Sequence, residues 1–210
     1  MPAKTDPHSS ASRELLEIDF PYPLVATGPA ADMEDRLAAI SQADLFGDRE
    51  IADLEMADAC LSGLWLRFDF LDRSHTISQD IKSATGSFWH GIMHRREPDW
   101  SNAKYWFRQV GTHEIFGDLQ SAAREIIAAE DSLELSFQSL ADSDEWDPFA
   151  FVDLCESASC SPVSPKPNMA GHGVTRLQRA EAACVQIQKA EWQLLFDWCF
   201  ARAVGESVGN

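Results

Sequence analysis

The feature that most constrains the fold is an apolar stripe with helical spacing. Its members recur every three or four residues for about five turns: Ile51, Leu54, Ala57, Leu61, Trp65 and Phe68. This spacing places the apolar side chains on one face of a helix, and that face must pack against another element. Gly63 lies inside the stripe, where glycine costs up to about 1 kcal/mol relative to alanine, and it therefore indicates close packing.

Comparable stripes and capping residues predict more helices along the chain. They cover residues 32–47, 85–97, 99–111, 114–129, 133–140 and 174–204, with a further helix that begins at Asp147-Pro148. Residues 72–84 show no pattern that assigns them. No segment alternates apolar and polar residues with the period of two that a half-buried strand shows. We therefore predict an all-α fold, with about six to eight packed, mostly antiparallel helices in a single domain.

The ends and one internal stretch differ in composition from the helices. Residues 1–30 are rich in Pro, Ser and Ala, and they predict an extended N-terminal arm that packs through Phe20 and Tyr22. Residues 31–207 would form the helical domain. Residues 157–172 are rich in Pro, Ser and Gly, and they predict a long loop within that domain.

Composition and charge exclude several classes of protein. The net charge is −17, and a broad basic face for a nucleic-acid backbone is absent. No apolar run reaches the length of a membrane span, and the polar first residues do not resemble a secretion signal. The five cysteines are scattered without a C-x-x-C pair, as is typical of reduced thiols. We expect a cytoplasmic protein that binds neither nucleic acid nor membrane.

Residues 89–113 form a basic, histidine-rich segment in this acidic chain. Two acids, Glu97 and Asp99, stand there against four cations and half of the six histidines: Arg95, Arg96, Lys104, Arg108, His90, His94 and His113. Such a concentration favours a bound anion or a metal ion. It marks a place on the chain rather than a reaction.

The helix predicted at residues 85–97 carries a candidate metal or catalytic site. His90, His94 and Glu97 fall on one face at i, i+4 and i+7. Two imidazoles and a carboxylate could bind Zn²⁺, Fe²⁺ or Mn²⁺, or act in acid–base catalysis. The zinc-protease pattern H-E-x-x-H is excluded, because Gly91 occupies the position of its glutamate. The alternative is that both histidines are hydrogen-bonded to carboxylates and bind no metal.

The cations offer candidate ligands for phosphate or carboxylate. Arg95 and Arg96 end the first helix, where they could clamp an anion or simply complement the helix dipole. Arg96 projects towards the apolar side, which predicts burial against Asp69 or Asp72. The rest of the candidate anion site comprises Asn102, Lys104, Tyr105 and Arg108 on the second helix, together with His75 and His113 from flanking segments.

Two strings resemble a signature of uncharacterised bacterial proteins of similar size. They are W-H-G-I-M-H-R-R-E-P-D-W-S-N-A-K-Y-W-F-R at residues 89–108 and S-H-T-I-S-Q at residues 74–79. The resemblance covers a small part of the chain, and it implies no activity.

Two functional hypotheses follow from the sequence. In the first, a pocket at residues 89–113 binds a small anionic metabolite, with metal-assisted or acid–base hydrolysis as the reaction. In the second, the protein is a non-catalytic interaction protein. Its long last helix would then form a homodimer, and residues 89–113 would form a structural network of ion pairs.

Overall fold

The computed structural model describes residues 9–130, 133–159 and 175–206, and within them the regular secondary structure is helical, without strands. The prediction of an all-α fold is confirmed. The elements are α1 Ser10–Leu16, the 3₁₀ helix η1 Ala31–Met33, α2 Glu34–Ala38, α3 Gln42–Phe46, α4 Leu54–Arg67, α5 Leu71–Ser78, α6 Ala84–Arg96, α7 Trp100–Val110, α8 Phe116–Ala129, α9 Leu135–Asp142, α10 Pro148–Ser159 and α11 Arg176–Ala203. No helix in the described ranges combines the length and apolar character that crossing a membrane requires.

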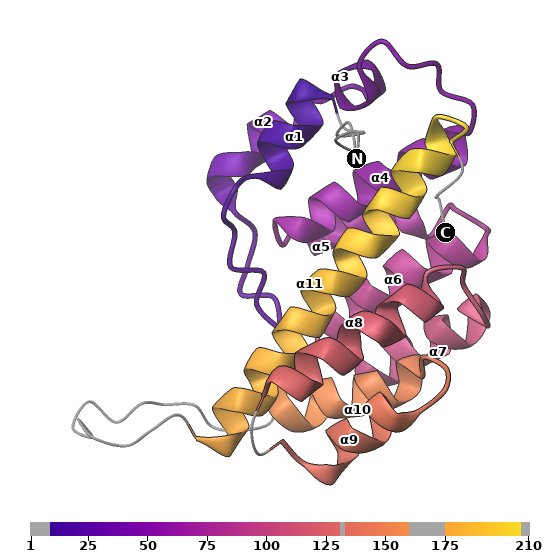
Figure 1. The fold of residues 1–210 in the computed structure, drawn as a ribbon. Helices are drawn as coiled ribbons and strands as arrows, with labels where there is room; N and C mark the ends of the chain where they lie inside the picture. Colours follow the sequence, from indigo (N-terminus) through magenta and orange to yellow (C-terminus); the bar gives the residue numbers. More distant parts are fainter. Residues whose placement is uncertain (1–8, 131–132, 160–174, 207–210) are drawn as a thin grey trace, which may run out of the picture.

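The long helix α11 runs along the molecule and packs against α4, α8 and α10 (Figure 1). Helix α6 lies beneath it, between α4 and α5 on one side and α7 on the other. The helices predicted at residues 85–97 and 99–111 form a hairpin, in which α6 ends at Arg96 and Asp99 caps α7 by accepting from the Asn102 N–H at 3.2 Å.

Three segments differ from the predicted elements. The helix expected at residues 32–47 is divided into η1, α2 and α3, because Ser41 starts a new helix with a capping box formed with Asp44. Residues 71–78, which overlap the unassigned stretch, form α5. The expected arm contains α1, capped by Ser9, so the described helices exceed the six to eight expected. Residues 160–172 of the predicted loop lie outside the described residues, whereas residues 157–159 end α10.

The rest of the arm packs as predicted. Residues 18–30 contain no helix, and they run along the ends of α4 and α6. The Ala26 N–H donates to the Arg96 carbonyl at 2.9 Å. Tyr22 is 1 % exposed, and the Phe20 ring lies 5.4 Å from that of Phe68. The arm therefore closes one end of the core.

Gly63 allows α4 and α6 to approach closely, as the sequence indicated. A Cβ atom at Gly63 would lie 2.8 Å from the indole ring of Trp89. The Gly63 carbonyl also accepts a hydrogen bond from the Trp192 indole at 2.8 Å. Both tryptophans are at most 1 % exposed. Three helices therefore meet where only glycine leaves enough room.

Two adjacent arginines fix the end of α6 from opposite sides. Arg95 forms a bidentate ion pair with Glu191 of α11, and both side chains are fully buried. Arg96 pairs with Asp69, also fully buried, and donates to the Leu66 carbonyl at 2.6 Å. The predicted burial of Arg96 against Asp69 or Asp72 is confirmed, with Asp69 as the partner. Helix α6 is thus bound to α11 and to the end of α4.

Burial by itself would lower the pKa of the Arg95 guanidinium. The attraction of Glu191 more than offsets this effect, so the pKa is raised. Removing one partner of such a pair leaves an uncompensated buried charge. We therefore expect Glu191→Gln to lower the free energy of unfolding by about 3–5 kcal/mol in urea denaturation. The double variant Arg95→Met/Glu191→Leu should recover most of the loss, because it removes both charges.

The matched control is Glu14→Gln, which breaks the exposed Arg36–Glu14 pair of 3.1 Å. Its effect should be much smaller, since exposed ion pairs contribute little. Equal losses for Glu191→Gln and Glu14→Gln would contradict the structural importance of the Arg95 pair.

Candidate metal centre

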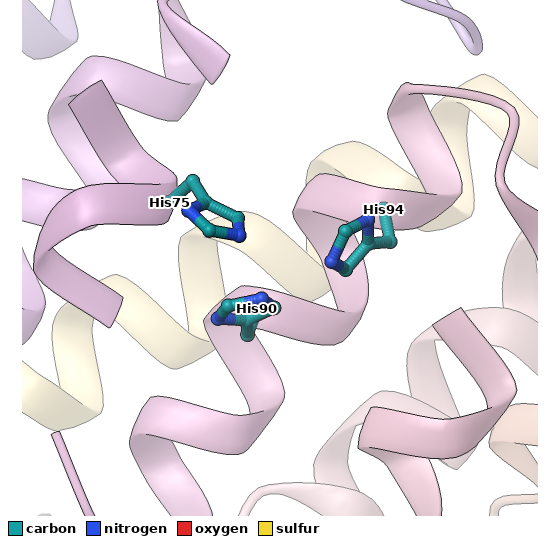
Figure 2. A group of neighbouring side chains, drawn as sticks. All are labelled: His75, His90 and His94. Carbon is teal, nitrogen blue, oxygen red and sulfur yellow. The ribbon is translucent and has the colours of Figure 1, made fainter. Parts of the chain in front are cut away.

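Three histidines converge between α5 and α6. His75 comes from α5, and His90 and His94 come from consecutive turns of α6 (Figure 2). One ring nitrogen from each lies within 4.8 Å of those of the other two. The ring centroids of His75 and His90 are 4.5 Å apart, and those of His90 and His94 are 4.9 Å apart. This is the one such group of potential metal ligands in the described ranges.

The cluster is largely shielded from solvent. His90 is 2 % exposed and His94 is 6 % exposed, whereas His75 is half-buried. The indole of Trp106, from α7, stacks on His90 with a centroid distance of 3.9 Å and an interplanar angle of 29°. Solvent therefore reaches the centre mainly from the His75 side.

The hydrogen bonds of Ser78 favour one tautomer of His90. The Ser78 hydroxyl donates to the His75 carbonyl at 3.3 Å and lies 3.2 Å from His90 Nδ1. A hydroxyl has one proton, so with that proton on the carbonyl, Nδ1–H of His90 is the donor to Ser78. The lone pair of His90 is then on Nε2, available to a metal.

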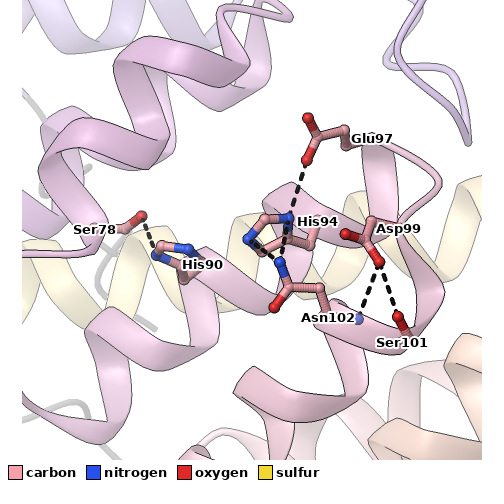
Figure 3. A network of polar contacts seen from close by, with 7 residues as sticks. All are labelled: Ser78, His90, His94, Glu97, Asp99, Ser101 and Asn102. Atoms are coloured by element: carbon pink, nitrogen blue, oxygen red, sulfur yellow. Dashed lines mark hydrogen bonds and ion pairs between the residues drawn. The ribbon is translucent and has the colours of Figure 1, made fainter.

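Glu97 has the same effect on His94. Its carboxylate can only accept, and it lies 3.0 Å from His94 Nδ1, so Nδ1 carries the proton (Figure 3). The amide nitrogen of Asn102 is 3.0 Å from His94 Nε2, which it supplies with a hydrogen bond. Histidine ligands of metals commonly donate their second N–H to a carboxylate or another oxygen in this way.

Burial favours the neutral imidazole at His90 and His94. It lowers the pKa of His90 to about 3, with further contributions from His94 and His75. Burial also lowers the pKa of His94, although Glu97 and Asp99 act in the opposite direction. Neutral imidazole is the form that binds metal.

The structure changes the third member of the predicted ligand set. His90 and His94 lie together as predicted, but His75 completes the group instead of Glu97. Glu97 is the C-cap of α6, with a side chain that is 52 % exposed, and it contacts His94 on the Nδ1 side. Its carboxylate therefore positions a histidine rather than joining the cluster. His75 lies on a helix and not in the expected flanking loop.

The predicted anion ligands do not converge on one place. Arg95 and Arg96 are paired with buried carboxylates, so neither is available to an external anion as the sequence suggested. Lys104 pairs with Asp153, and Arg108 lies 5.7 Å from the ring of Phe149. Tyr105 is 51 % exposed. At the start of α7, the Asn102 N–H is bonded to Asp99, so a carboxylate of the chain occupies the expected anion position.

His113 lies apart from the cluster. Its Nδ1 accepts from the Ile115 N–H at 3.4 Å, and its Nε2 is 3.2 Å from the Thr85 hydroxyl. The ring also packs against Phe88 and Trp198. His113 is therefore a structural histidine of the α6–α8 interface.

Sequence reasoning missed Ser78 and the role of Trp106. The spacing of His75 and Ser78, at i and i+3, was the available signal, since it places both on one side of a helix. The stacking of the Trp106 indole on His90 depends on the pairing of α6 with α7, which spacing within one helix does not reveal.

Comparisons of this chain with protein-family models, curated proteins and solved structures found no match. The functional argument therefore rests on the geometry of the site.

Burial lowers the pKa of His113 to about 4, below its ordinary value of 6.5. The unfolded chain therefore binds a proton more readily, and stability is lost as pH falls from 6.5 towards 4. Between pH 6.5 and 4, we expect the free energy of unfolding of chelator-treated wild-type protein to fall by up to about 3 kcal/mol through this residue. The free energy of unfolding of His113→Gln should fall by less over the same interval. Denaturant titrations at each pH measure the difference, and parallel curves would contradict it.

Proposed function

We propose that His75, His90 and His94 bind a divalent transition-metal ion, which serves a hydrolytic reaction. The convergence of three histidine nitrogens within 4.8 Å is the observation that carries this proposal. Three histidines with an open fourth position are a known ligand set of catalytic zinc sites. A tetrahedral ion needs ligand nitrogens about 3.3 Å apart, so shifts of roughly 1 Å would close the set around it.

The ligand chemistry favours Zn²⁺ or Fe²⁺ over Mn²⁺. Imidazole suits zinc and iron, whereas manganese prefers carboxylate and water oxygens. Replacement of Glu97 by His75 in the group makes it an all-nitrogen set. Of the three metals considered from the sequence, manganese is therefore the least favoured.

A bound metal would supply Lewis-acid activation of water or of a substrate carbonyl. The chain's residues prepare the site for it. Ser78 and Glu97 hold the Nδ1 protons of His90 and His94, which leaves the Nε2 atoms as the metal-binding nitrogens. At His94 the ion would replace the hydrogen bond that Asn102 makes to Nε2. Trp106 covers one face of His90 and limits solvent on that face. Glu97, exposed beside His94, is the nearest candidate to exchange a proton with substrate.

The competing hypothesis of a structural network describes the cations well. Arg95, Arg96 and Lys104 each pair with a carboxylate far away in the sequence, which removes most of the motive for a bound anion. Dimerisation through α11 has less support, because most apolar positions of that helix are buried or partly buried against its own chain. The histidine cluster has no role in either structural account.

Metal analysis of protein purified without chelator tests the proposal. We expect close to one equivalent of Zn or Fe, and its loss in His75→Ala, His90→Ala and His94→Ala, because removing one of three ligands usually destroys a site. His113→Ala is the matched control and should retain the metal. If chelated wild-type protein neither binds Zn²⁺ or Fe²⁺ in calorimetry nor gains melting temperature from them, the proposal fails.

The positioning residues give a graded test. Ser78→Ala and Glu97→Gln keep all three ligands but alter the groups that hold their Nδ1 protons. We expect each to weaken zinc affinity by about 10- to 100-fold in competition titrations with a chelator. Asp80→Asn, which changes an exposed acid beyond the end of α5, should leave the affinity unchanged. Wild-type affinity in both positioning variants would mean that Ser78 and Glu97 do not act on the ligands.

A further inference from the structure

A pocket with a volume of about 500 Å³ lies where the N-terminal arm, the start of α5 and the end of α6 meet, and none of the three histidines lines it. Its lining includes residues 69–73, at the junction of α4 and α5, and residues 96–98, at the end of α6. The arm and Glu34 complete its wall. A hollow of this size can accommodate a small metabolite.

The pocket and the cluster share two helices. Helix α5 lines the pocket at Leu71 and Asp72, and it presents His75 about one turn later. Helix α6 presents His94 and reaches the pocket at Arg96. Glu97 belongs to both places, since it lines the pocket and accepts from His94 (Figure 3). A molecule in the pocket would therefore lie about one helical turn from His75 and against the carboxylate that holds His94.

The charges that line the pocket favour a cation. Four acids face two arginines there. Asp69 is committed to Arg96, and Glu34 lies 3.5 Å from Arg73. Within the described part of the chain, the Asp72 side chain has no ion pair or hydrogen bond, and Glu97 contacts a neutral imidazole. Two negative charges are thus uncompensated, in a protein whose net charge is −17.

The remaining lining is partly apolar. Phe70, Leu71, Pro29 and Pro98 contribute to the wall. A ligand that fits both kinds of surface carries an ammonium group on an aliphatic chain. This chemistry is opposite in charge to the anion that the sequence alone suggested.

We propose that this pocket binds the ammonium end of an aliphatic amine substrate, whose hydrolysable group reaches the three-histidine centre. The substrate role rests on the proposed metal-dependent function. The preference of the pocket for an ammonium ion does not, because it depends on Asp72, Glu97 and the apolar wall alone.

The binding test uses hexylammonium as the probe and hexanoate as its anionic counterpart, at equal ionic strength. Isothermal titration is run on the full chain, both after chelation and after addition of Zn²⁺. We expect saturable binding of hexylammonium and none of hexanoate. Asp72→Asn should weaken the affinity for hexylammonium by about threefold to fivefold, because an exposed charge partner is lost. Asp80→Asn, an exposed acid outside the pocket, is the matched control and should bind as wild type does.

The outcomes separate this inference from the metal proposal. Preferential binding of hexanoate, abolished by Arg73→Ala, would overturn the inference and identify an anion pocket. Absence of hexylammonium binding, or equal losses in Asp72→Asn and Asp80→Asn, would also overturn it. Hexylammonium binding to a protein that takes up no metal would leave the cation pocket intact and refute only the metal proposal.

A second measurement tests the adjacency of pocket and centre. Mn²⁺ added in excess to the chelated protein should broaden the proton resonances of bound hexylammonium, because the ion would lie close to the probe. His90→Ala should abolish the broadening without changing the affinity for hexylammonium. In wild-type protein that binds both Mn²⁺ and the probe, sharp resonances would refute the shared site.

Discussion

The rest of the structure depends on two buried ion pairs, in which Arg95 and Arg96 bind carboxylates of other segments. The two side chains leave the same turn of α6 in different directions, one to Glu191 of α11 and the other to Asp69 after α4. Helix α6 also carries His90 and His94. Because a buried charge is strongly destabilising without its partner, these ion pairs leave α6 few alternative positions. The geometry of the histidine cluster follows from that constraint.

Much of the fold could be predicted from hydrophobic spacing, but α11 shows where this reasoning fails. Its buried face passes through Gln188 and Glu191, which are fully buried because they contact Arg95. A pattern search treats such polar residues as exposed. Apolar spacing alone therefore does not mark the buried face of α11, on which Trp192 is buried whereas Trp198 is only half-buried. The partner that justifies a buried glutamate lies 96 residues away.

The candidate site was predictable only within a single helix. His90 and His94 follow from i, i+4 spacing, whereas His75 joins them through the packing of α5 on α6. The cations were visible in the sequence, but their partners were not. Asp69, Asp153 and Glu191 come from three other segments, and an excess of positive charge that looks local disappears once they are in place. Local composition could therefore identify the segment, but it could not show whether its ligand is positively or negatively charged.

The separation of Arg95 from Glu191 also affects how the protein is made. A ribosome adds residues from the N-terminus, so α5, α6 and α7 leave it well before residue 191 is synthesised. During that interval, Arg95 has no carboxylate from α11, and burying it alone would be unfavourable. We therefore expect the nascent helices to remain partly open during that interval. The three histidines would then reach their final geometry only after α11 has docked.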